Sequence, residues 1–144
     1  MRAELNSNLV SAYPELLGAN IEVGVGDGWY NIVDCALALL QHHCTQQTDA
    51  YERALVTSKS NERPLHKHEC QALAAGPGKQ PKAAQIKEKF GGLRLYVDGV
   101  DTYGAGVIAM AEQLSVLTCD QCGAPGERHG GAWIRTRCKK HKKD

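Results

Sequence analysis

The sequence lacks an apolar run long enough to cross a membrane. Its longest aliphatic stretch is CALALL at residues 35–40, whereas a membrane-spanning helix needs about 20 apolar residues. The opening residues, MRAELNSNLVSAYPELL, also lack the apolar stretch of a signal peptide. With 42% hydrophobic and 23% charged residues, the composition is that of a globular domain. We therefore expect a cytoplasmic protein that has no contact with a membrane and keeps its thiols reduced.

The chain also lacks a strong net charge, which is only +1. The charges are nevertheless unevenly distributed. Residues 1–58 contain two Lys or Arg and seven Asp or Glu, whereas residues 59–144 contain fifteen and nine. Six of these cations fall within the last ten residues. A basic chain end can attract phosphate polymers, but it can equally serve only to keep the end in solution.

Motifs that bind nucleotide phosphates are missing. The glycine cluster GVGDG, at residues 24–28, is followed by Trp29 where the dinucleotide pattern needs glycine. The stretch AAGPGKQP would be a P-loop only with glycine in place of Leu73 and Ser or Thr in place of Gln80. We interpret GVGDG as a structural turn before a helix.

The clearest helical periodicity begins at Trp29. Apolar residues from there to Cys44 fall on one helical face, and Asp27 is a suitable N-cap before them. A second apolar stripe predicts a helix over residues 102–117. Residues 45–82 are polar, and two weakly helical segments within them lack an apolar stripe, so we interpret this region as a loosely packed insert.

The stretch AAQIKEKFGGLRLYVDG predicts a β-hairpin at residues 85–97 with Gly91-Gly92 as its two-residue turn. In that register Phe90 pairs with Leu93, and one face of the hairpin is apolar and must pack on helices. The opposite face carries three cations and a tyrosine, namely Lys87, Lys89, Arg94 and Tyr96. Like charges across a hairpin repel, and a bound anion or a nearby carboxylate would relieve the repulsion.

Glu88 is the one charged residue on the apolar face of this hairpin. A carboxylate there would have a raised pKa unless a cation such as Arg94 or Arg135 reaches it. Two interpretations are open. Glu88 is either an acid, base or binding residue, or a bulge or edge position turns it outward.

Soft metal ligands are concentrated near the end of the chain. Two pairs, Cys119-x2-Cys122 and Cys138-x2-His141, are separated by fifteen residues, and this spacing is typical of tetrahedral zinc sites. Gly123 permits the tight turn after the second cysteine. Four protein ligands close the coordination sphere, so we predict structural Zn²⁺. A redox-active pair or disulfides are the alternatives.

A second metal site is a further hypothesis. The stretch HKHEC contains His66, His68 and Cys70, and His42 and His43 precede Cys44 in the first predicted helix. Adjacent residues of a helix point in different directions, which argues against this site.

We therefore predict an α+β fold, with helices packed on a small antiparallel β-sheet. Residues 1–117 would form the core, with the polar insert at about 45–82. Residues 118–144 would form a zinc-knuckle or treble-clef-like module with a basic tail.

Three motifs carry a resemblance to a protein family. These are GDGWY, the hairpin sequence KEKFGGLR, and the ending TCDQCGAPG followed by WIRTRCKKH. They resemble a family of small uncharacterised proteins of bacteriophages and bacterial prophages, over residues 20–45 and 83–141. The resemblance implies the cytoplasm of a bacterial host as the location, and it implies no particular activity.

Our first functional hypothesis is a non-enzymatic module that binds nucleic acid. Its phosphate contacts and one stacking ring would come from the cationic hairpin face and the basic chain end. The predicted binding residues are Lys87, Lys89, Arg94, Tyr96, Arg135, Arg137, Lys139 and Lys140.

Two other hypotheses remain open. A chain with an acidic first part and a basic second part can bind a protein and modulate a host or phage machine. A zinc-stabilised, nuclease-like enzyme would have to use Glu88, Asp98, Asp101 and His129, and no motif spacing unites these four residues.

Overall fold

The computed structural model describes residues 1–19, 21–130 and 133–142. Its helices are α1 (Ala3–Ala12), α2 (Pro14–Leu17), α3 (Tyr30–Ser60), α4 (Lys67–Ala75) and α5 (Thr102–Ser115), with a 3₁₀ turn, η1, at Asp27–Trp29. Its strands are β1 (Val23–Gly24), β2 (Lys82–Lys89), β3 (Gly92–Asp98), β4 (Glu127–His129) and β5 (Arg135–Arg137). The predicted α+β architecture is therefore confirmed. No helix in the described part of the chain is both long and apolar enough to cross a membrane.

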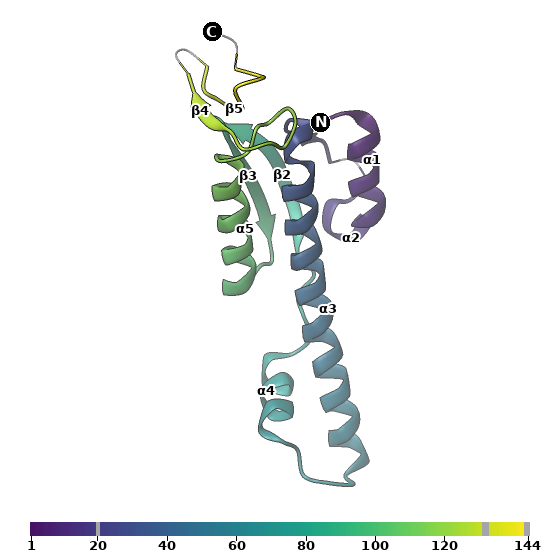
Figure 1. Ribbon diagram of the computed structural model, residues 1–144. Helices are drawn as coiled ribbons and strands as arrows, with labels where there is room; N and C mark the ends of the chain where they lie inside the picture. Colours follow the sequence, from purple (N-terminus) through teal and green to yellow (C-terminus); the bar gives the residue numbers. More distant parts are fainter. Residues whose placement is uncertain (20, 131–132, 143–144) are drawn as a thin grey trace.

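Helix α3 is the central helix of the fold. In Figure 1 the sheet lies behind its first half, with α5 on one side and the α1–α2 pair on the other. The side chains of Trp29, Val33 and Leu37 are fully buried. They form one hydrophobic core with buried residues of the sheet and of α1 and α2, including Ile86, Leu93, Leu95, Leu9 and Leu16.

The sheet has three strands in the order β1-β2-β3. Strands β2 and β3 are antiparallel, as predicted, but β1 adds a parallel pairing that the sequence did not reveal, so the sheet is mixed. The edge of β3 that faces away from β2 is covered by α5. The N–H of Leu93 donates to Ser115 Oγ at 2.8 Å, and the N–H of Leu95 donates to Glu112 Oε1 at 3.1 Å.

The hairpin turn differs from the prediction by one residue. Lys89 pairs with Gly92, so Phe90 and Gly91 form the turn, with φ angles of 52° and 73°. Two consecutive positive φ angles are typical of a type I′ turn. The two predicted faces survive, because Ile86 still lies opposite an apolar partner. Phe90, however, leaves the apolar face and is 64% exposed at the tip.

The predicted polar insert is largely helical. Helix α3 continues to Ser60 and then α4 packs back against it, so the two form an arm that projects from the body (Figure 1). Glu69 holds the start of α4, because its two oxygens accept hydrogen bonds from Arg63 at 2.7 and 2.8 Å. The N–H of Gly78 donates to Thr48 Oγ1 at 3.1 Å and ties the end of the arm to α3.

The glycine cluster GVGDG is a structural turn, as interpreted, but Asp27 does not cap the following helix. Its carboxylate instead accepts from the backbone N–H of Arg2 at 2.7 Å and pairs with the guanidinium of the same residue. Asp101, in contrast, is the N-cap of α5, because its Oδ1 accepts from the N–H of Gly104 at 3.0 Å.

Candidate metal centre

Residues 118–142 form a short module at the end of α5. Cys119 and Cys122 lie on a tight turn that closes with a hydrogen bond from Gly123 N to the carbonyl of Cys119 at 3.0 Å. Gly123 has a φ of +75°, which fits the glycine expected there. The β4–β5 hairpin follows, and a second tight turn carries Cys138 and His141, with His141 N donating to the carbonyl of Cys138 at 2.9 Å.

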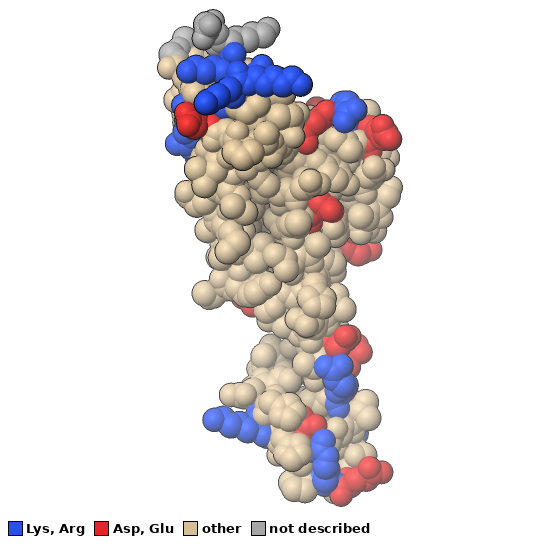
Figure 2. Space-filling model, viewed as in Figure 1, with Lys and Arg blue, Asp and Glu red and all other residues tan. Residues whose placement is uncertain are grey.

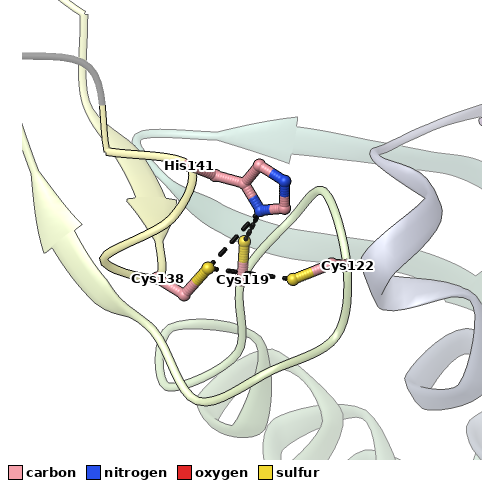
Figure 3. Close-up of side chains that lie close together, drawn as sticks. All are labelled: Cys119, Cys122, Cys138 and His141. Carbon is pink, nitrogen blue, oxygen red and sulfur yellow. Dashed lines mark hydrogen bonds between the residues drawn. The ribbon is translucent and has the colours of Figure 1, made fainter.

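The four predicted ligands converge on one point (Figure 3). Their ligand atoms all lie within 4.8 Å of one another. His141 Nδ1 is 3.4 Å from the sulfurs of both Cys119 and Cys138, and the sulfurs of Cys122 and Cys138 are 3.8 Å apart. In a tetrahedral zinc site these separations are about 3.5 Å for sulfur to nitrogen and about 3.8 Å for sulfur to sulfur. The Cys3His group therefore has the geometry to hold a metal ion such as Zn²⁺.

The acid–base properties of the cluster favour a bound cation. Burial opposes ionisation of Cys119, but N–H groups of Cys138, Gln121 and Cys122 point at its sulfur and lower its pKa to about 6. The N–H of Ala124 acts in the same direction on Cys122, yet burial and the neighbouring sulfurs outweigh it and raise the pKa of Cys122. The neighbouring sulfurs thus hinder ionisation of Cys122, and a divalent cation removes that conflict.

A buried carboxylate joins the two ligand pairs. Asp120, between the first two cysteines, lies with Oδ1 2.6 Å from Nε of Arg137 and with Oδ2 3.7 Å from Nη1 of Arg135. The contact with Arg137 is an ion pair that is not aligned as a hydrogen bond. Burial raises the pKa of Asp120, and the two guanidinium groups partly offset that effect. The N–H of Asp120 also donates to the carbonyl of Thr136 at 3.0 Å.

Among the described residues, contacts at three places attach the module to the core. Trp29 Nε1 donates to the carbonyl of Thr118 at 2.7 Å, and Thr136 Oγ1 donates to the carbonyl of Gly91 in the hairpin turn. The third contact is between the GVGDG turn and the first cysteine pair, where a Cβ on Gly26 or Gly28 would overlap backbone atoms of Asp120 or Cys119. Glycine is therefore required at both positions, and the ligand cluster is built directly on the start of α3.

Glu88 links the hairpin turn with the module. Its Oε1 accepts from the N–H of Gly91 at 2.7 Å, and its Oε2 is 4.0 Å from Nη1 of Arg135. Arg135, one of the two cations expected near this carboxylate, is thus present. These contacts are those of a residue that holds a turn in place.

The cationic residues predicted to bind nucleic acid differ in their surroundings. Lys89, Lys139 and Lys140 are exposed. Arg135 and Arg137 face Asp120, and Arg94 Nη1 donates to the carbonyl of Leu93 and lies 3.7 Å from Glu112. In Figure 2 Lys and Arg gather at the end of the molecule formed by this module. Lys143, part of the predicted tail, lies outside the described residues.

The other candidate sites do not assemble. Among the described residues, only the Cys3His group brings three or more potential ligands together, so the hypothetical site of His66, His68 and Cys70 does not form. Asp101 lies at the start of α5, and its Oδ2 is 2.8 Å from Nε2 of His43 in α3. His129 is in β4. The four residues considered for an enzyme therefore lie on separate elements.

The positions of three residues in this region were not predicted from the sequence. The alternation of Arg135 and Arg137 places two cations on one side of a strand and indicates an acidic partner, but it does not identify Asp120 as that partner. Phe90 and Trp133, which are 64% and 70% exposed, carry no local signal of exposure.

No protein-family model, curated protein or solved structure matches the chain. The resemblance to phage and prophage proteins therefore stays a prediction.

Proposed function

We propose that this chain is a zinc-stabilised protein that binds single-stranded nucleic acid. The observation that carries the proposal is Phe90, a bulky aromatic residue with a φ of 52° and a side chain 64% exposed. A positive φ costs such a residue about 1–3 kcal/mol, and strain of this kind is often retained at functional sites. Burial cannot explain the residue, so contact with a ligand is the better explanation.

Phe90 is one of three exposed aromatic residues whose ring lies next to the cationic group of a Lys or Arg side chain. Lys87 Nζ lies 5.2 Å from the ring centre of Tyr96, and Lys89 Nζ lies 5.4 Å from that of Phe90. The guanidinium of Arg135 lies 5.6 Å from the ring centre of Trp133. A ring that can stack on a base, beside a cation that can meet a phosphate, is the basic unit of single-strand binding.

We infer that the three pairs follow one path. Tyr96 lies opposite Gln85, four residue pairs from the end of the hairpin, which is about 13 Å along the strands. Beyond the tip, Ile134, next to Trp133, comes within reach of Gly91. A path from Tyr96 past Phe90 to Trp133 therefore suits about four nucleotides, the lower end of the range for stacking platforms.

The metal would fix this surface in place. The module has few buried apolar residues, so zinc binding, worth on the order of 10 kcal/mol in small zinc domains, would supply most of its folding energy. Zinc with three thiolates carries one net negative charge, which the adjacent Lys139 and Lys140 would offset. The role we propose for zinc is structural, because four protein ligands leave no open position for a substrate.

Fluorescence anisotropy with labelled 15-nucleotide DNA, RNA and duplex DNA tests the proposal. We expect the single strands to bind more tightly than the duplex, with affinity falling as salt rises at a slope of about −0.7 per phosphate contact. Trp133→Ala and Tyr96→Ala should each weaken binding about tenfold. Tyr103→Ala, a 46% exposed tyrosine on α5, is the matched control and should have no effect.

Tighter binding to the duplex would contradict single-strand recognition. No binding at 50 mM salt would contradict the proposed function altogether. Equal effects of Tyr96→Ala and Tyr103→Ala would show that the aromatic path is not the binding surface.

A further inference from the structure

The groove between α3 and α5 is apolar and open to solvent. Its volume is about 650 Å³, and none of the described residues that line it is charged. The buried residues Ala36 and Ala111 form its floor, and the exposed side chains of Leu39 and Met110 line it nearer the surface. In Figure 2 the surface over α5 is almost without Lys, Arg, Asp and Glu. We propose that a second copy of this chain docks in this groove, with the α5 helices of the two copies packed against each other.

Helix α5 is apolar on both sides. Its inner side packs on α3 and β3 and buries Gly104, Ala111 and Ser115. Its outer side exposes Tyr103 by 46% and Met110 by 66%, among other apolar residues. A helix that is apolar all round is normally covered on all sides.

The outer residues of α5 have the spacing of a helix–helix interface. Tyr103, Val107, Met110 and Leu114 follow one another at intervals of four, three and four residues, and Leu117, just after the helix ends at Ser115, continues the pattern. This is the spacing of the a and d positions of a coiled coil, whose side chains insert between those of a facing helix. The structure contains no such facing helix over this seam within the described residues, so the seam fits a helix from another molecule.

The partner is a second copy because this chain carries both halves of the contact. The seam of large residues on α5 lies beside a groove with small residues at its floor, and a two-fold axis brings each seam onto the other copy's groove. Glu112 is the one charged residue of α5. Its carboxylate is turned toward β3, where Oε1 accepts from Leu95 and Oε2 faces Arg94, so two α5 helices can approach without like charges meeting. A charged peptide would lose hydration in this groove and gain no ion pair.

The exposed apolar area of the groove is sufficient for a dimer of moderate affinity. Leu39, Tyr103, Met110, Leu114 and Leu117 are between 43% and 66% exposed and together present roughly 500 Å² of apolar surface, near the upper end for the largest patch of a monomer. A standard interface buries about 800 Å² per partner, which the remaining residues of the groove can complete. We expect a dissociation constant on the order of micromolar.

Sedimentation velocity of the full zinc-loaded chain, from about 1 to about 100 µM, tests the inference. We expect the mass to rise with concentration from the 15.6 kDa of one chain to twice that value. Met110→Glu should hold the protein as a monomer over this range. Ala109→Glu is the matched control, because Ala109 is exposed on the same helix but does not line the groove, and it should dimerise as the wild type does.

Thiol labelling provides a second readout that does not depend on the variants. Cys35 lies in the groove and Cys70 lies on the arm, and both are free and exposed. Labelling of Cys35 should slow at least fivefold as the protein dimerises, while labelling of Cys70 stays constant. A monomeric mass at 100 µM, or equal effects of the two glutamate variants with circular dichroism unchanged, would overturn the inference. The test is independent of nucleic-acid binding.

Discussion

Arg137 and Asp120 form an ion pair of 2.6 Å that connects the two halves of the Cys3His group. Asp120 lies inside the first ligand pair, and Arg137 immediately precedes the second. Both side chains are mostly buried, so the pair fixes the two turns relative to each other in the folded module. The geometry of the centre therefore depends on residues that are not themselves ligands.

Replacing Asp120 should weaken metal binding without removing a ligand. In Asp120→Asn the guanidinium of Arg137 remains buried without its counter-charge, which destabilises the folded module to which zinc binding is coupled. We expect zinc affinity to fall about tenfold, measured by competition with a chromophoric chelator. Glu127→Gln, which changes an exposed carboxylate on β4, is the control. Unchanged affinity in Asp120→Asn would mean that the ligands alone fix the site.

Removing the metal should unfold the module and leave the core intact. The zinc-loaded chain should contain one zinc ion, and Cys138→Ser should contain less than about a tenth as much, since a three-ligand site binds far more weakly. After chelation, amide NMR signals of residues 119–142 should collapse while those of Leu37 and Ile86 persist. Cys70→Ser is the control for loss of an exposed thiol. A tail whose signals are unaffected by chelation would show that zinc does not fold it.

Two glycines should respond in opposite ways to alanine. A Cβ on Gly28 would overlap the carbonyl of Cys119 and lie 2.5 Å from the N atom of Gly123, so Gly28→Ala should destabilise the protein by about 1–3 kcal/mol or more. A Cβ on Gly106 meets no heavy atom within 4 Å, and Gly106→Ala should stabilise α5 by about 1 kcal/mol. Urea unfolding measures both. Equal changes in the two variants would contradict the close contact between the GVGDG turn and the cysteine turn.

Replacing Phe90 should stabilise the protein and weaken its binding to single strands. Asparagine adopts positive φ more easily than phenylalanine, and Asn-Gly is a favoured pair in a type I′ turn. Phe90→Asn should therefore raise the free energy of unfolding by about 1 kcal/mol and weaken single-strand binding about tenfold. Urea unfolding and anisotropy test the two effects separately. A variant that is more stable and binds as well as the wild type would remove the main argument for the proposed function.

The arm should lose stability in acid through Glu69. The hydrogen bond from Arg63, followed by that from the N–H of His66, lowers the pKa of Glu69 from its usual 4.5 to about 2. A lowered pKa in the folded state means that the carboxylate stabilises the fold fully above pH 4.5 and loses this effect as the pH falls toward 2. The difference in unfolding free energy between wild type and Glu69→Gln should therefore shrink over that interval. A difference independent of pH would contradict the Arg63–Glu69 pair.

The features that depend on local sequence were predicted well. The four ligands were found because their spacing alone brings each pair to one ion. The faces of the β2–β3 hairpin were found because side chains alternate along a strand whatever the register. The turn itself was misplaced, since a Gly-Gly pair is a more favourable turn than Phe-Gly on propensity alone.

The features that depend on distant contacts were not predicted. The second half of α3 lacks an apolar stripe because it packs against one short helix only, α4, whose start is held by the contact of Arg63 with Glu69. The parallel strand β1 is two residues long, too short to carry a periodic signal. The pairing of Asp120 with Arg137 joins residues that a hairpin separates, and only the folded chain brings them together.

Side chains of neighbouring helices accept hydrogen bonds at both edges of the three-stranded sheet. Ser115 and Glu112 accept the N–H groups of Leu93 and Leu95 in β3, and Asn6 of α1 accepts the N–H of Val23 in β1 at 3.0 Å. An exposed edge strand is the usual template for edge-to-edge growth into aggregates and fibrils. With these donors already satisfied, an extended segment from another molecule finds little main chain to pair with. Any self-association of this protein is thereby directed away from open-ended strand addition, in agreement with the closed contact between helices that we propose.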